Sequence, residues 1–407
     1  MRKTVMPYSH HLFRSDYDCQ EHEMKDLMEL PPFTEIDEAV SFAEQQTLKS
    51  IADLGDKFKP SASTGNFYPK SENDEWTNGM WTGEINVMYE LTGRKSFKEK
   101  ALEHVGAFKY RIDEMVSIHN HDMGFLYCPS CVAGYNLYES EDGKASAIKA
   151  ADYLVSRFQK KGRFIQAWGP VGERKNYRLI IDCLMNIPLL FWASEVTGDL
   201  RYREVALAHF NTSINCVLRQ DDSTYHTYFF DPDTGAPLYG VTHQGNRNDS
   251  AWARGQAWGI YGSALAYRYT GDEKARNVFD RTLAYFIKHL PDSVIPYWDF
   301  DFDDPSDEPR DSSALAIAVC GMYEMSDLTG EKNLRLQADR LLGELYRKCA
   351  VKDPSVSNGQ LLHGVYCKKT PTNDARDRGV DECNTWGDYF YVEALMRSKN
   401  PGWKAYW

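Results

Sequence analysis

The sequence predicts an all-α protein that folds as a single-domain (α/α)6 toroid of six helical hairpins. Thr-Gly signals that end helices recur about 50 to 75 residues apart, and charged residues that open a new helix follow each of them. This spacing suits two helices with their loops, whereas strand patterns are confined to residues 225–230 and 294–302. The signals end at Gly93, Gly143 (the weakest copy), Gly198, Gly271 and Gly330.

The helices follow from these signals in order. Glycine readily adopts the positive φ that ends a helix, so the first helix of each pair should stop there and the second should begin directly afterwards. Helices at 35–51 and 387–396 complete about six hairpins. An open solenoid would fit the same repeat, but neither end shows a polar capping repeat. The second helices are expected at 95–112, 145–158, 201–217, 273–290 and 332–349.

The domain organisation is simple. Residues 1–34 are polar and irregular, so we expect an N-terminal arm that lies on the body of the protein. Residues 35–407 contain no linker and are expected to form one (α/α)6 domain. Short loops fall at one end of the hairpins, and long loops rich in polar and aromatic residues fall at the other, where they should shape a cleft.

The stretch from Asn176 to Gly198 contains the first candidate for chemistry. Asn186 is a plausible N-cap, Pro188 suits a first helical turn, and the helix should stop at Gly198. Just ahead of it, Asp182 stands among apolar residues, where a carboxyl group can keep the raised pKa that a general acid needs. The alternative is a buried aspartate that caps the helix or ties down a loop.

Asp122 is the second candidate carboxylate. It stands between His121 and a glycine, Gly124, in a turn that could aim its side chain into the cleft, although a plain Asx-turn explains the pattern equally well. If Asp122 and Asp182 lie close together, each changes the pKa of the other, and one of them can donate a proton at neutral pH.

A third pattern, from Trp252 to Trp258, combines aromatic rings with Arg254. Arginine offers a planar fork for a substrate carboxylate, and tryptophan faces stack on sugar rings. The alternative is a tryptophan pair packed in the core, with Arg254 bonded to a loop carbonyl. His226 and His243 could bind a metal, but the histidine and cysteine spacings match no known metal pattern, so we expect neither a metal nor a cofactor.

Composition excludes several classes of partner. The net charge is −12 and no basic tract is present, so we expect no nucleic acid and no anionic membrane surface as partner. The start of the sequence lacks the apolar region of a signal peptide, and no apolar run is long enough to span a membrane. Nine cysteines, an odd number, favour free thiols and a cytoplasmic location. Cys128 and Cys131 form one isolated C-x-x-C pair, which we interpret as packing residues.

Four motifs, in order and sensibly spaced, resemble the unsaturated glucuronyl hydrolases of glycoside hydrolase family 88. The resemblance runs from about residue 35 to residue 400, and the (α/α)6 barrel of that family agrees with the repeat described above. The motifs are His121-Asp122-Met-Gly-Phe, Ile180-Ile-Asp182-Cys-Leu-Met-Asn186, Thr242-His-Gln244-Gly and Trp252-Ala-Arg254-Gly-Gln-Ala-Trp258-Gly.

The resemblance implies a substrate and a reaction. The substrate would be an unsaturated uronyl disaccharide or short oligosaccharide made by a polysaccharide lyase. The enzyme would hydrate the C4=C5 vinyl ether of its terminal Δ4,5-unsaturated uronic acid. Asp182 would protonate C4 and then activate the water that adds at C5, and Asp122 would bind ring hydroxyls and tune Asp182. Substrate contacts are implied for Trp76, His121, Trp168, His226, Gln244, Trp252, Arg254 and Trp258.

One departure concerns specificity. Family members that accept sulfated disaccharides carry Ser-x-x-Ser-x-Lys in a C-terminal loop, where this chain has His363-Gly-Val-Tyr366-Cys-Lys368. By this correspondence His363, Tyr366 and Lys368 are also expected to contact the substrate. The lysine is kept and both serines are replaced by larger side chains, which leaves the preference for sulfated substrates open. Two other readings remain: an unsaturated rhamnogalacturonyl hydrolase on the same fold, and a sugar-binding toroid without catalysis.

Overall fold

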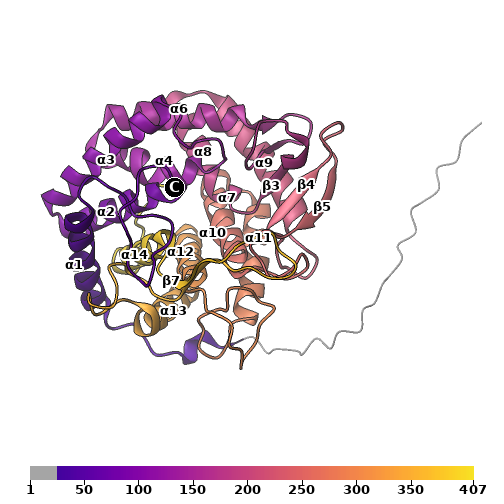
Figure 1. The fold of residues 1–407 in the computed structure, drawn as a ribbon. Helices are drawn as coiled ribbons and strands as arrows, with labels where there is room; N and C mark the ends of the chain where they lie inside the picture. Colours follow the sequence, from indigo (N-terminus) through magenta and orange to yellow (C-terminus); the bar gives the residue numbers. More distant parts are fainter. Residues whose placement is uncertain (1–24) are drawn as a thin grey trace, which may run out of the picture.

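The computed structural model describes residues 25–407, and its helices form an inner and an outer ring (Figure 1). The inner helices are α2 (Asn78–Thr92), α4 (Met123–Tyr127), α5 (Ala133–Tyr138), α7 (Cys183–Asn186), α8 (Pro188–Thr197), α10 (Ala253–Thr270), α12 (Ser312–Thr329) and α14 (Thr385–Lys399). The outer helices are α1 (Ile36–Leu54), α3 (Lys95–Asp113), α6 (Glu141–Ser156), α9 (Leu200–Val217), α11 (Glu273–Lys288) and α13 (Lys332–Cys349). A π-helical turn (Cys128–Val132) joins α4 to α5, so α4 with α5 and α7 with α8 each serve as one member of the inner ring.

Burial explains why the two rings differ in sequence. In α10 every residue from Ala253 to Ala266 is buried, because other helices or loops cover all of its faces. The outer helix α11 buries residues three or four positions apart, such as Ala275, Val278 and Phe279, and turns its charged face to solvent. An inner helix such as α10 is therefore buried on every face over most of its length, whereas an outer helix such as α11 reads as amphipathic.

The ring is closed. The last inner helix, α14, packs against the first, α2, as well as against α12. At this junction the buried Lys59 lies 2.9 Å from Glu84 on α2 and 3.1 Å from Asp388 on α14, measured from Nζ to the carboxylate oxygens. A buried ammonium group is tolerated only with such partners, so this cluster ties the two ends of the ring together. The all-α toroid is confirmed, and the open solenoid is not.

The four strong Thr-Gly signals end helices as predicted. Each glycine has a φ between 62° and 77° and donates its N–H to the carbonyl four residues earlier, at Gly93, Gly198, Gly271 and Gly330. The weak copy at Gly143 was assigned wrongly, because Gly143 lies inside the first turn of α6. There its N–H bonds the N-cap side chain of Ser140, and Glu139, with a φ of 59°, ends the preceding helix instead.

The predicted cap at Asn186 is also wrong. Asn186 is the last residue of α7, and Ile187 stands at the N-cap of α8, which begins at Pro188. The side chain of Asn186 is used elsewhere, because its Oδ1 accepts the N–H of Phe125 from α4 at 3.0 Å. The side chain thus connects two inner helices rather than starting one.

Within residues 25–407, seven short strands lie in the loops and pair only as antiparallel neighbours, in the orders β1-β2, β3-β4-β5 and β6-β7. The strand predicted at 225–230 is confirmed by β4, but residues 294–302 form only isolated bridges, because their N–H groups bond several separate segments. The strands are β1 (Phe158–Gln159), β2 (Phe164–Ile165), β3 (Arg178–Ile180), β4 (Thr227–Phe230), β5 (Pro237–Val241), β6 (Gly364–Cys367) and β7 (Arg378–Glu382).

Most of the predicted N-terminal arm, residues 1–24, lies outside the described residues. The remainder, from residue 25 to residue 34, lies against α13, where Arg347 donates a 2.7 Å hydrogen bond to the carbonyl of Pro32. Across residues 25–407, no helix combines the length and the apolar character that crossing a bilayer requires.

Candidate active site

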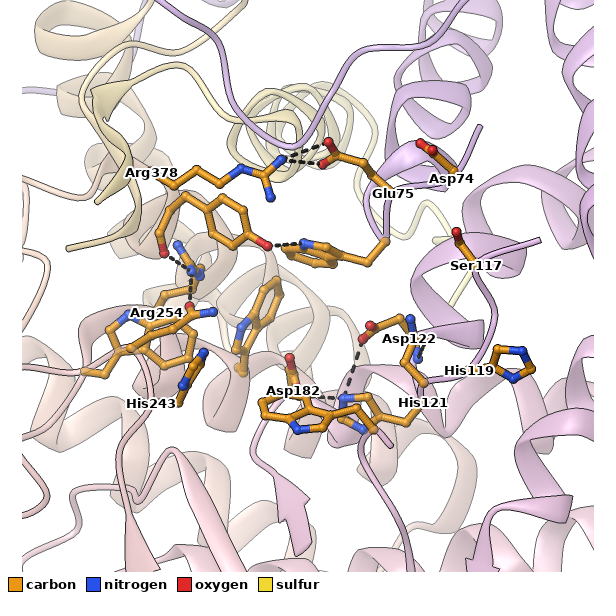
Figure 2. A pocket seen from close by; sticks show the side chains of 17 residues that line it. Asp74, Glu75, Ser117, His119, His121, Asp122, Asp182, His243, Arg254 and Arg378 are labelled. Carbon is orange, nitrogen blue, oxygen red and sulfur yellow. Dashed lines mark hydrogen bonds and ion pairs between the residues drawn. The ribbon is translucent and has the colours of Figure 1, made fainter. Parts of the chain in front are cut away.

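The long loops surround a cavity of about 630 Å³ (Figure 2). Its lining comes from the segments that precede α2, α4, α7 and α10, and from β6 and β7, so residues far apart in the sequence meet there. The lining residues are Asp74, Glu75, Trp76, Ser117, His119, Asn120, His121, Asp122, Trp168, Asp182, His243, Gln244, Trp252, Arg254, Trp258, Tyr366 and Arg378.

Asp182 reaches the cavity because β3 ends just before it. The strand is held by β4, and Asp182 then occupies the N-cap position of the short helix α7. Its side chain makes no capping hydrogen bond, and its Oδ1 has no hydrogen-bond partner among the described residues. The side chain is 19% exposed, so the carboxylate is available to the cavity. A purely capping role therefore does not account for Asp182.

Asp122 is held beside it by a second turn. Asn120 forms the Asx-turn, since its Oδ1 accepts the N–H of Asp122 at 2.9 Å, and the side chain of Asp122 itself makes no capping bond. Gly124 has a packing role, because a Cβ at this position would lie 2.4 Å from the Cα of Asn186. The close approach of α4 to α7, together with the bond from Phe125 to Asn186, fixes the two carboxylate-bearing turns relative to each other.

His121 connects the two carboxylates, as Figure 2 shows. Its Nε2 lies 3.3 Å from Asp182 Oδ1 and 3.5 Å from Asp122 Oδ1, and its side chain is only 2% exposed. Burial opposes a charge on this imidazole, but the two carboxylates outweigh burial and raise the pKa of His121. Burial, with a contribution from the charge of Asp182, raises the pKa of Asp122 to about 6. A raised carboxyl pKa is thus found on Asp122, one member of the candidate pair.

Aromatic rings form the walls of the cavity. Trp252 and Trp258 are almost wholly buried and make its closed side. Trp76 stacks on Trp386, with ring centroids 5.2 Å apart, and donates its Nε1–H to the hydroxyl of Tyr366 at 2.9 Å. Such rigid, amphipathic faces suit the flat apolar surfaces of sugar rings.

Arg254 has a supporting role. Its guanidinium lies between the rings of Trp252 and Trp386 and donates to the carbonyls of Val365 and Tyr366 on β6, at 2.5 and 2.7 Å. The same group donates to Oε1 of Gln244 at 2.6 Å. Arg254 therefore bonds main-chain carbonyls, as the alternative interpretation predicted, and it also lines the cavity. Its main effect is to hold Gln244 and β6 in place.

Comparison with known proteins places this geometry in a family. The profile of Glycosyl Hydrolase Family 88 matches residues 52–380. The chain belongs to glycoside hydrolase family 88. The unsaturated chondroitin disaccharide hydrolase of Streptococcus pneumoniae is 43% identical over 388 residues, which cover 94% of this chain and 96% of the relative.

Two solved family structures are similar along nearly the whole chain. The unsaturated glucuronyl hydrolase of Streptococcus agalactiae superposes with a TM-score of 0.89 at 42% identity, over 95% of this chain and 98% of that one. An Asp→Asn variant of the same enzyme, complexed with dGlcA-GalNAc6S, gives a TM-score of 0.82 at 39% identity, over 94% and 96% of the two chains.

Three residues that the family resemblance led us to expect as substrate contacts do not line the cavity of this family 88 protein. His226 is buried behind Trp252, with its Nδ1 2.6 Å from Thr227 Oγ1, and burial keeps its pKa well below the ordinary range. His363 is half exposed and contacts Asp381 at 2.7 Å. Lys368 bonds Glu308 at 2.6 Å, away from the lining residues. The other residues expected to be catalytic or to contact the substrate all line the cavity.

Sequence reasoning missed several residues that line the cavity of this family member. Asp74 and Glu75 directly precede Trp76, and Ser117, His119 and Asn120 directly precede His121, so extending the motifs by a few positions would have found them. His243 belongs to one of the family motifs and was considered as a metal ligand, but it was not proposed as a substrate contact. Arg378 had no signal of its own, because only the pairing of β7 with β6 brings it to the cavity.

The same three central residues are the only group of potential metal ligands found in the described part of this family 88 chain. One ligand atom each from His121, Asp122 and Asp182 lies within 4.8 Å of the others. One imidazole and two carboxylates are a donor set that divalent cations accept. That the protein needs no metal therefore stays a prediction, and chelation tests it.

Proposed function

We propose that this chain is an unsaturated glucuronyl hydrolase. It would remove the Δ4,5-unsaturated uronic acid from the non-reducing end of glycosaminoglycan oligosaccharides made by a lyase. One observation carries the proposal: two carboxylates, Asp122 and Asp182, meet at His121 inside an aromatic-walled cavity, in a chain of family 88. The names of the relatives, an unsaturated chondroitin disaccharide hydrolase and an unsaturated glucuronyl hydrolase, support the same activity.

The reaction needs one acid and one water. Asp182 donates its proton to C4 of the C4=C5 double bond, and the positive charge that develops at C5 is shared with the ring oxygen. The carboxylate of Asp182 then takes a proton from a water molecule as the oxygen of that water bonds to C5. The product is a hemiketal at C5, which opens and releases the aglycone sugar.

The cluster keeps a carboxyl proton available near neutral pH. Asp122 has a pKa of about 6 because it is buried and lies near the charge of Asp182. The imidazole of His121 contacts both carboxylates, so the three groups hold protons in common rather than independently. Asp182 is the donor in this scheme because its side chain is exposed to the cavity and makes no capping hydrogen bond, and Asp122 binds ring hydroxyls.

The shape of the cavity orients the substrate. The unsaturated ring lies at the closed side, between Trp252 and Trp258, where water is largely excluded and the fixed amide of Gln244 can accept or donate a hydrogen bond. The aglycone leads toward the open side, which Ser117 and His119 border with exposed side chains. A site closed at one side suits an enzyme that removes one terminal sugar at a time.

One assay tests the proposal. Turnover removes the C4=C5 chromophore, so the loss of ultraviolet absorbance is followed with unsaturated disaccharides from chondroitin, hyaluronan, heparin and pectin. We expect turnover of the chondroitin or hyaluronan disaccharide by the wild type and none by Asp182→Asn, with the exposed rim variant Asp74→Asn as a matched control. Activity on the pectin product alone would instead identify a rhamnogalacturonyl hydrolase, and no activity on any of them would leave a sugar-binding toroid.

We also propose that the enzyme works in the cytoplasm. All eight described cysteines are free thiols, and six of them are buried. Cys128 and Cys131 lie in the buried turn between α4 and α5, where burial raises the pKa of both thiols and keeps them unreactive. These features suit a reducing compartment and a packing role for the C-x-x-C pair.

A further inference from the structure

One ion pair lies on the lining of the cavity and is not used by the mechanism. Arg378 Nη2 lies 2.8 and 3.0 Å from the two carboxylate oxygens of Glu75, so the guanidinium faces the carboxylate as Figure 2 shows. Glu75 is held from behind by the N–H and the hydroxyl of Ser61. The guanidinium of Arg378 also lies over the ring of Tyr366, at 4.8 Å from its centroid.

This pair stands on the open side of the cavity. The side chains of Arg378 and Glu75 are 39% and 23% exposed, whereas Arg254 and Trp258 on the closed side are each 1% exposed. A terminal sugar that reacts at Asp182 occupies the closed side, so the next sugar must pass the exposed groups. The pair therefore faces the aglycone rather than the unsaturated ring.

The pair also controls the charge of that side. Among the described arginines and lysines that line the cavity, Arg254 is enclosed by β6 and the tryptophans, and only Arg378 is substantially exposed. Lys368, the cation expected from the sequence, is neutralised by Glu308 outside the lining. Glu75 cancels the charge of Arg378, so the pair itself adds no net charge to this side of the cavity.

We propose that the Glu75–Arg378 pair determines how the enzyme treats an anionic group, such as a sulfate ester, on the aglycone sugar. The inference rests on the proposed function and adds a residue pair that sets its substrate range. While the pair is intact, it neither attracts nor repels the sulfate strongly, so sulfated and unsulfated disaccharides are used at similar rates. Removing either charge unmasks the other.

The experiment measures kcat/KM for the unsaturated uronyl N-acetylgalactosamine disaccharide with and without a 6-O-sulfate. Glu75→Gln leaves Arg378 uncompensated and should raise the sulfated-to-unsulfated ratio about three- to tenfold. Arg378→Gln leaves Glu75 uncompensated and should lower it by a similar factor. Arg378→Lys should change the ratio little, and the double variant should return to within about twofold of wild type.

A matched control comes from Glu35 and Arg347, whose side chains form a similarly exposed pair, 3.1 Å apart, at the outer ring. Their glutamine variants should leave the ratio unchanged. If the wild type is active, the inference is overturned when the sulfated-to-unsulfated ratio shifts in the same direction for Glu75→Gln and Arg378→Gln, or shifts in neither. Absence of turnover by the wild type would overturn the proposed function as well. If Glu75→Gln does not fold, Arg378→Glu replaces it and must lower the ratio further than Arg378→Gln.

Discussion

Replacing Asp122 by asparagine should make the protein more stable and less active. Asparagine keeps the shape of the side chain but removes the charge that burial opposes. The pKa of Asp122 is raised from 3.8 to about 6, mainly by burial and then by the charge of Asp182. Between these two pH values Asp122 binds more protons in the folded protein than in the unfolded chain, so its contribution to stability falls as pH rises from about 4 to about 6.

The size of the effect follows from the same shift. A difference of about two pH units corresponds to about 3 kcal/mol, which is an upper limit for the free energy that Asp122→Asn recovers above pH 7. Part of this gain is lost, because the charge of Asp122 also stabilises a protonated His121. We therefore expect about 1–2 kcal/mol, or about 1–3 °C in Tm for a chain of this length. Near pH 4 the gain should vanish, because Asp122 is then neutral in the folded wild type.

The assay is thermal unfolding of wild type and Asp122→Asn at pH 4.5 and at pH 7.5. Asp74→Asn serves as the control, because Asp74 is an exposed aspartate of the same cavity and should show no gain at either pH. Turnover should fall in Asp122→Asn, with KM changed as well as kcat, since the side chain also binds substrate. A Tm at pH 7.5 that is equal to or below that of the wild type would refute the argument from burial.

Four further predictions follow from the site. Asp182→Asn should lower kcat at least about 100-fold in the ultraviolet assay, and activity within a few-fold of wild type would remove Asp182 from its role. Dialysis against EDTA should leave kcat/KM unchanged if the site needs no metal, and loss that Mg²⁺ or Mn²⁺ restores would contradict that prediction. Lys368→Ala should change turnover of the unsulfated disaccharide little, and the wild type should use the unsulfated form at least as well as the 6-sulfated one. Gly124→Ala should cost about 1–3 kcal/mol in chemical denaturation and lower kcat, because its Cβ would meet the backbone of Asn186; an unchanged variant would mean that α4 can move freely.

Local signals in the sequence were enough to predict the helical hairpins. A helix ends where a residue such as Gly198 can adopt positive φ, and this depends on the residue and on the few residues before it. Reliance on local signals also explains two wrong predictions. Gly143 is a residue type typical of a helix end, and Asn186 is one typical of a helix start. Neighbours that are distant in the sequence or on the next turn give both residues different partners.

The candidate carboxylates were also recognisable from the sequence, since Asp122 and Asp182 stand in unusual local surroundings within family motifs. Only the tertiary structure decided that His121 joins them and that the pKa of Asp122 is raised. A pKa depends on burial and on charges within a few ångströms, and these are contributed by turns about 60 residues apart in the chain.

The choice of charged residues that face the open side of the cavity depended still more on the tertiary structure. Lys368 and Arg378 are both basic residues near the end of the chain, and the family motif singled out Lys368 rather than Arg378. The pairing of β6 with β7 turns Arg378 toward Glu75, while Lys368 meets Glu308 outside the lining. Sequence can show which charges a loop carries, but only the packing of the closed ring decides which of them face the substrate.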